Sequence, residues 1–263
     1  MNQLNVNLPE LPYAVSEAMN RLRINIKFCG KNTRKILLTS CQPNEGKSTI
    51  SSYLWKMLAE AGFPTVLVDV DLRKSVMKTR FQMDYDDDTT MGLNHYLSGM
   101  AEYEDVVYST NIPNGYMVPC TQLLENPSAL LEDVRFKELL NTLSENYRFV
   151  IIDSPPLGSV SDGALIASLC DGAVLVVRAG TTPRTLIKQS LYEIQQSGCK
   201  LLGTVLNRAD VKGRAYGKYG YGKYGYGYGY GYGYGYGYGY GYEPKDKKNS
   251  SDSAATDKNS TGN

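Results

Sequence analysis

Residues 40–49 read SCQPNEGKST, and they lie between the apolar run KILLT (35–39) and a segment that reads as a helix from Ile50 onward. A strand, a tight loop ending in Gly-Lys-Ser and a helix are the context that a phosphate-binding P-loop requires. Cys41 stands where the common pattern has glycine, so one glycine of the motif is missing. A chance Gly-Lys-Ser after a strand is the alternative, and further motifs are needed to distinguish the two.

The loop residues have distinct predicted roles in binding ATP. In a P-loop the backbone N–H groups and the amino end of the following helix surround the β-phosphate. Gly46 would permit the close approach, Lys47 would offset charge on the β- and γ-oxygens, and the Ser48 hydroxyl would ligate Mg²⁺. We predict that ATP is bound by Asn44, Glu45, Gly46, Lys47, Ser48 and Thr49.

Aspartates follow two further apolar runs. VLV (66–68) leads into Asp69 and Asp71, and FVII (149–152) leads into Asp153. Open α/β sheets bind ligands at the carboxyl ends of their parallel strands, and Mg²⁺ prefers oxygen ligands. An aspartate after a strand is also a common turn residue, but three such motifs at one edge favour a nucleotide site. We predict a metal site of Ser48, Asp71 and Asp153, and a catalytic set of Lys47, Asp69 and Asp71 in which either aspartate accepts a hydroxyl proton.

The alternation of strand and helix signals predicts the fold class. Short apolar runs indicate five buried strands, at 36–38, 66–68, 149–152, 173–177 and 201–206. Helix starts are indicated by Asn126-Pro127 and Thr182-Pro183, and helix stops by Gly62 and Gly198. This order predicts an α/β fold with a mostly parallel sheet and helices on both faces. Residues 80–119 are less regular, and we expect an insertion with a short helix at the active-site edge.

Composition excludes several classes of function. Lys and Arg number 28 against 27 Asp and Glu, so the broad positive charge that nucleic acid requires is missing. The five cysteines form no CxxC pair and the chain has one histidine, which is typical of a reduced compartment and not of a zinc site. No apolar run approaches the roughly 20 residues that cross a bilayer. We expect a cytoplasmic chain.

The end of the last predicted strand offers a candidate for base recognition. LLGTVLN (201–207) ends at Asn207, and Arg208 follows. The amide of Asn207 would recognise the edge of adenine while the guanidinium of Arg208 stacks on the ring. A strand-terminating asparagine with no ligand is an alternative of nearly equal weight.

The carboxy-terminal part of the chain is a tyrosine-glycine repeat. We divide the sequence into an amino-terminal helical segment (1–30), a P-loop domain (31–210) and a tail (211–263). Glycine at every second position makes ordering costly, so we expect a disordered tail and disfavour a stacked adhesive. Its predicted phosphate acceptors are Tyr216, Tyr219, Tyr221, Tyr224, Tyr226, Tyr228, Tyr230, Tyr232, Tyr234, Tyr236, Tyr238, Tyr240 and Tyr242.

These motifs together resemble the bacterial tyrosine kinases, the autokinases of polysaccharide export. SCQPNEGKST is similar to their first Walker motif, VLVDVDLR (66–73) to their aspartate motif, and FVIIDSPP (149–156) to their second Walker motif. The resemblance implies a P-loop ATPase-like fold, autophosphorylation with ATP and Mg²⁺, and control of capsular or extracellular polysaccharide. It also implies a separate membrane activator that recruits the kinase to the inner face of the membrane, and a cognate tyrosine phosphatase.

One departure and two competing functions remain. The family has a Glu, Arg, Arg pattern that joins subunits into a ring, and here Glu17 and Arg23 are present but Asn20 replaces the middle arginine. Self-association is implied, and ring assembly stays open.

A partition-type ATPase switch would carry an extra lysine where this loop has Gln42. A catalytically weak, nucleotide-bound scaffold that binds partners through its tail is the other alternative.

Overall fold

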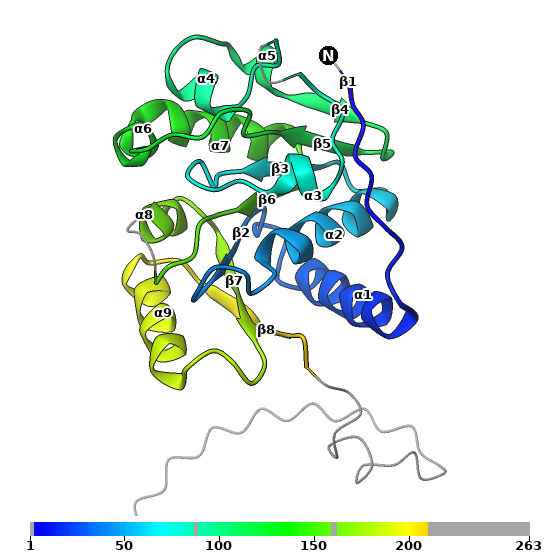
Figure 1. The fold of residues 1–263 in the computed structure, drawn as a ribbon, viewed down its shortest axis with the longest axis vertical. Helices are drawn as coiled ribbons and strands as arrows, with labels where there is room; N and C mark the ends of the chain where they lie inside the picture. The colour runs from blue at the N-terminus through cyan, green and yellow to red at the C-terminus, as the bar shows by residue number, and fades with distance from the viewer. Residues whose placement is uncertain (1–2, 87–88, 159–161, 210–263) are drawn as a thin grey trace, which may run out of the picture. The chain divides into compact units, whose positions relative to one another are not determined.

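The computed structural model describes residues 3–86, 89–158 and 162–209, and eight strands within them form one sheet in the order β1-β4-β5-β3-β6-β2-β7-β8 (Figure 1). All neighbours pair in parallel except β4 and β5. The strands are β1 (Gln3–Leu4), β2 (Lys35–Ser40), β3 (Thr65–Asp69), β4 (Tyr108–Thr110), β5 (Gly115–Val118), β6 (Phe149–Asp153), β7 (Gly172–Arg178) and β8 (Leu201–Asn207).

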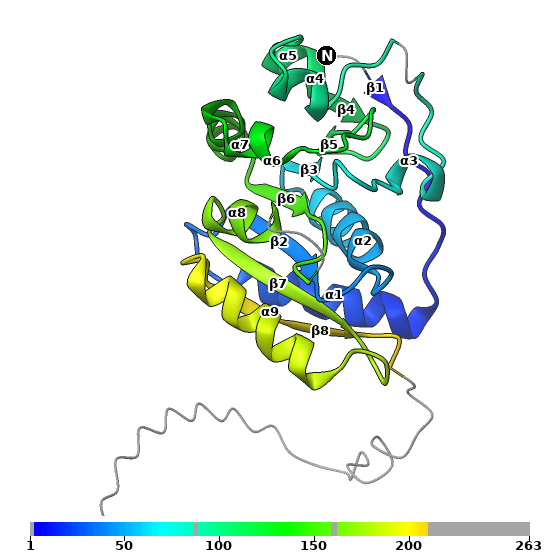
Figure 2. The same cartoon turned by 60° about the vertical axis from the view of Figure 1, so that its left-hand side comes forward.

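Helices cover both faces of this sheet, as the alternating pattern predicts. Helices α1 to α3 pack on the face that carries Ile36 and Leu38, and α6 to α9 pack on the face that carries Leu37 (Figures 1 and 2). They are α1 (Tyr13–Lys27), α2 (Lys47–Glu60), α3 (Met77–Arg80), α4 (Leu93–Leu97), α5 (Tyr103–Val106), α6 (Ser128–Glu132), α7 (Val134–Asn146), α8 (Asp162–Ser168) and α9 (Arg184–Gln196). Among the described residues, none of these helices is long and apolar enough to cross a membrane.

The sequence prediction needs correction at two places in the sheet. Residues 80–119 contain the expected short helix α4, but they also supply β4 and β5, and β5 pairs with β3. Strand β8 lies at the edge of the sheet, so it is half-exposed instead of buried, with Leu206 61% exposed. An edge strand has a neighbour on one side only, which leaves more of its surface in water.

Helix ends follow the predicted signals with one shift. Gly62 and Gly198 adopt positive φ angles of 87° and 77° directly after the ends of α2 and α9, as helix stops do. The two prolines occupy the capping position, so α6 and α9 begin one residue later than the sequence indicates. The Thr182 hydroxyl therefore does not cap α9. It contacts Glu45 of the P-loop instead.

Candidate active site

The P-loop connects β2 to α2 at the carboxyl edge of the sheet. Helix α2 begins at Lys47, so the first N–H groups of the helix have no carbonyl partner within it and can bind an anion. Gly46 has a φ of 100°, which favours glycine. A Cβ atom at this position would lie 2.2 Å from the amide nitrogen of Asn207, so a larger residue would also have to displace that side chain.

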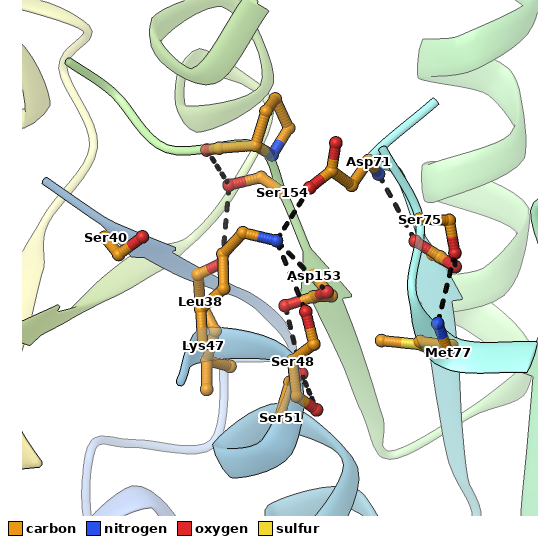
Figure 3. Close-up of polar contacts among 12 residues, drawn as sticks. Leu38, Ser40, Lys47, Ser48, Ser51, Asp71, Ser75, Met77, Asp153 and Ser154 are labelled. Atoms are coloured by element: carbon orange, nitrogen blue, oxygen red, sulfur yellow. Dashed lines mark hydrogen bonds and ion pairs between the residues drawn. The ribbon is translucent and has the colours of Figure 1, made fainter. Parts of the chain in front are cut away.

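Lys47 lies between Asp71, in the segment after β3, and Asp153, the last residue of the neighbouring strand β6 (Figure 3). Its Nζ atom is 2.8 Å from Asp71 Oδ2 and 3.6 Å from Asp153 Oδ2, and 9% of its side chain is exposed. Burial alone would lower the pKa of Lys47, but the carboxylates of Asp153 and Asp71 raise it above its usual value. Lys47 is therefore positively charged at neutral pH and can offset charge on a phosphate.

Asp153 and Ser48 provide oxygen atoms suited to a magnesium ion. One carboxylate oxygen of Asp153 accepts a hydrogen bond from the Ser51 hydroxyl at 3.1 Å, and the other is buried with no hydrogen-bond partner among the residues that the structure describes. The Ser48 hydroxyl lies 3.3 Å from Lys47 Nζ. No group of three or more His, Cys, Asp or Glu side chains in the described ranges could hold a metal ion. Mg²⁺ at phosphate sites uses one or two carboxylates together with the substrate's phosphates, so these residues fit it.

Asp69 and Asp71 occupy different surroundings. Asp69 is 1% exposed, and its oxygens accept hydrogen bonds from the Ser75 hydroxyl and from the Asp71 N–H. Burial, followed by the charge of Asp153, raises the pKa of Asp69 to about 8, although the Ser75 hydroxyl opposes the shift. Asp71 instead bonds to Lys47 and lines the pocket. Of these two aspartates, Asp71 lines the pocket and Asp69 does not.

A pocket of about 200 Å³ lies over this group. Prolines from the P-loop and from the loop after β6 form one part of its wall, and basic residues of the segment after β3 form another. The predicted site residues that line it are Asn44, Gly46, Lys47, Ser48 and Asp71. The pocket therefore combines a cationic end for phosphates with an apolar wall.

The predicted base-recognition residues line a second pocket of about 560 Å³ between α1 and the end of β8. Thr49 also lines this second pocket, and it does not line the first one. Asn207 donates its amide hydrogen to the Glu45 carbonyl at 2.7 Å, so it contacts the P-loop directly. Arg208 follows with a φ of 54° and an exposed side chain.

Comparisons with known proteins show the family of the chain. A family described as an AAA domain matches residues 33–195. The chain is 42% identical over 208 residues to the tyrosine-protein kinase CpsD of Streptococcus agalactiae, covering 79% of this chain and 90% of that one. The chain belongs to the bacterial tyrosine kinases. It is a protein-tyrosine kinase with the fold of nucleotide-binding P-loop ATPases.

Solved structures place this tyrosine kinase among relatives of the same architecture. The chimerical protein CapA2B2 matches with a TM-score of 0.70 and 33% identity, and the match covers 78% of this chain and 92% of the CapA2B2 chain. The kinase domain of the Escherichia coli tyrosine kinase ETK has a TM-score of 0.67 and 28% identity, with coverages of 81% and 80%. The septum site-determining protein MinD of Pyrococcus horikoshii, solved with Mg-ADP, scores 0.56 at 25% identity, with coverages of 67% and 72%. This lower similarity disfavours the partition-type alternative.

The arginine of the kinase's aspartate motif has partners that sequence reasoning missed. Arg73 binds the buried carboxylate of Asp162 at 2.8 Å and the Ser128 hydroxyl at 3.1 Å. Ser128 in turn donates a 2.6 Å hydrogen bond to Asp162. The segment after β3 is thus tied to α6 and α8. No motif in the sequence marks Asp162, because its partner lies 89 residues away.

The predicted subunit-contact residues lie on α1 of the kinase. Arg23 donates two hydrogen bonds, of 3.1 and 2.7 Å, to the side-chain oxygen of Asn20 on the same helix. The asparagine that replaces the family's arginine therefore binds the arginine that remains. Whether subunits form a ring stays a prediction.

The buried Asp69 predicts a pH dependence of the kinase's stability. Its folded pKa of about 8 lies above the ordinary value of 3.8, so its contribution is fully present below 3.8 and is lost as pH rises through about 8. Asp69→Asn removes this loss. The variant should therefore gain stability relative to the unmodified chain between about pH 5 and about pH 8.5, measured by urea unfolding. A constant difference between the two chains across this range would contradict the expectation.

Proposed function

We propose that this kinase transfers the γ-phosphoryl group of ATP, bound with Mg²⁺, to the tyrosines between Tyr216 and Tyr242 of its own chain. The observation that carries the proposal is that Lys47 contacts both Asp71 and Asp153 beside the P-loop. The acceptor tyrosines lie outside the described residues. Their number, and the kinase family to which the chain belongs, support them as the substrate.

The proposed mechanism assigns a step to each side chain. Lys47 moves its charge from the aspartates to the β- and γ-phosphate oxygens. Asp71 accepts the phenolic proton as the tyrosine oxygen forms its bond to the γ-phosphorus, while the bond from this phosphorus to the bridging oxygen breaks and ADP leaves. Asp153 and Ser48 would hold Mg²⁺, which offsets charge on the phosphates when bound.

The kinase would act in the control of capsular or extracellular polysaccharide. A separate membrane protein would activate it and hold it at the inner face of the membrane, and a tyrosine phosphatase would reverse its action. Each phosphate adds about −1.5 to −2 charges at neutral pH, so a modified tail becomes strongly anionic. Self-association and partner binding would then change with phosphate load.

Intact mass measurement tests the proposal. The full chain, incubated with ATP, Mg²⁺ and the cytosolic segment of a candidate activator, should gain several phosphate masses. Deletion of 216–242 should remove most of them and leave ATP binding intact. A chain of full length with these tyrosines replaced by phenylalanine is the matched control, because it keeps the tail and lacks its hydroxyls.

Two results would oppose this function. Equal mass gain in the shortened chain would place the acceptors elsewhere. Absence of any phosphate on the full chain, with the activator present and ATP bound, would instead support the nucleotide-bound scaffold.

A further inference from the structure

The carboxylate of Glu45 points into the P-loop itself. Its Oε2 atom accepts hydrogen bonds from the N–H groups of Cys41 and Gln42, at 2.8 and 3.0 Å. Glu45 is 2% exposed, while its neighbours Asn44 and Gly46 line the pocket of about 200 Å³ that lies over Lys47 and Asp71. Glu45, which the sequence predicts to contact ATP, is thus a buried side chain that does not line this pocket.

Two more contacts connect Glu45 to residues at the ends of β7 and β8. The other carboxylate oxygen accepts a hydrogen bond from the Thr182 hydroxyl, between β7 and α9. Thr182 is itself fixed to Arg178, because its hydroxyl oxygen lies 3.2 Å from both the N–H and the carbonyl of that residue. The Glu45 carbonyl accepts the Asn207 amide at 2.7 Å. The loop after β2 is thus tied to the ends of β7 and β8.

We propose that Glu45 is a positioning residue that, with Thr182, holds the P-loop in the shape that binds the nucleotide's phosphates. A free carboxylate beside phosphates would repel them. The Glu45 carboxylate accepts hydrogen bonds from two N–H groups and a hydroxyl. These contacts fix the backbone conformation of the loop residues before Gly46 and Lys47. The kinetic test of this inference rests on the proposed function. The test by ADP binding does not require phosphoryl transfer.

The contacts predict that shape matters here more than charge. A glutamine at position 45 keeps one oxygen for the N–H groups of Cys41 and Gln42. Its amide can donate to Thr182, since a hydroxyl can both donate and accept. An alanine loses all of these hydrogen bonds. Glutamine should therefore recover most of what alanine loses.

Binding of fluorescent ADP with Mg²⁺ to the full chain tests the proposal. Glu45→Ala should weaken binding about tenfold or more, because charge-assisted hydrogen bonds are lost, and Glu45→Gln should recover most of the affinity. In phosphorylation assays Glu45→Ala should raise KM for ATP about tenfold and lower kcat by less than about threefold. Thermal melting checks that each variant is folded.

Thr182 provides a second test, because it does not line the pocket over Lys47 and Asp71. Thr182→Val should weaken ADP binding, and Thr182→Ser should not. Thr181→Val is the matched control, because the exposed Thr181 hydroxyl contacts only the nearby carbonyl of Ala179, at 3.4 Å. The double variant of Glu45→Ala and Thr182→Val should weaken binding less than the sum of the single effects, since both remove one network.

Three outcomes would overturn the inference. They are unchanged ADP binding in folded Glu45→Ala, glutamine as weak as alanine, and unchanged binding in Thr182→Val. The second would indicate a direct role of the Glu45 charge at the ligand. Weak ADP binding in Glu45→Ala, together with no phosphate transfer by the unmodified chain, would support the positioning role and reject the proposed function.

Discussion

Lys47→Met is expected to reduce incorporation of phosphate by at least about 100-fold, the scale on which removing one charge-stabilising donor slows an enzyme. The lysine lies 2.8 Å from Asp71 and 3.6 Å from Asp153, at the start of α2. Methionine keeps the length of the side chain and removes its charge. Labelling with radioactive ATP measures the loss.

A lysine on the same helix provides the control for this variant. Lys56 lies near the other end of α2 and pairs with Glu60 at 3.7 Å on the surface. Lys56→Met should retain activity, and both variants should keep the far-UV circular dichroism of the unmodified chain. Labelling that persists in Lys47→Met would remove this residue from the mechanism.

Asp71→Asn is expected to lower kcat by about 100-fold or more, whereas Asp69→Asn should lower it by less than about tenfold. Asp71 lines the pocket and would accept the proton of the substrate hydroxyl. Asp69 is buried against Ser75 with a pKa raised to about 8, so at neutral pH it resembles the uncharged asparagine. Single-turnover rates at saturating ATP separate the two.

The paired variants decide a question that the sequence leaves open. An equal loss in both would indicate that Asp69 is also required in its ionised form. A larger loss in Asp69→Asn would reverse the assignment of the base. Binding of ADP by each variant separates the loss of chemistry from the loss of the nucleotide.

The central strands of the fold are predictable from sequence because each contains a short, uninterrupted apolar run. Strands β2, β3, β6 and β7 are buried on both faces and appear as short runs of Ile, Leu and Val. Strands β1, β4 and β5 have two, three and four residues and contain Tyr, Ser, Gln or Gly, so no pattern identifies them. Strands β4 and β5 pair with each other, and they join β1 and β3 only through residues that are far away in the chain.

The site is predictable where strand order alone brings residues together. Because β3, β6 and β2 are neighbours, the motifs that follow them must meet at one edge, and Lys47, Asp71 and Asp153 do so. An extended backbone would place Asp69 and Asp71, two residues apart, on the same side. However, β3 ends at Asp69 and a turn follows, in which the Leu72 N–H binds the Val70 carbonyl at 2.8 Å.

Residues that act across long sequence separations could not be predicted. Glu45 and Thr182 are 137 positions apart, and Asn207 reaches Glu45 across 162. Each residue alone has an ordinary explanation in the sequence, as a loop acid, a helix-start threonine and a strand-end asparagine. Only the sheet, which places β7 and β8 beside the P-loop, makes them one network.

The contact between Lys47 and Asp71 implies an order of events. A phenol that enters the empty pocket meets a carboxylate oxygen already bonded to an ammonium group, so it finds no ready acceptor for its proton. A triphosphate that draws the ammonium group away frees this oxygen. In the proposed mechanism the donor nucleotide would therefore bind before the tyrosine.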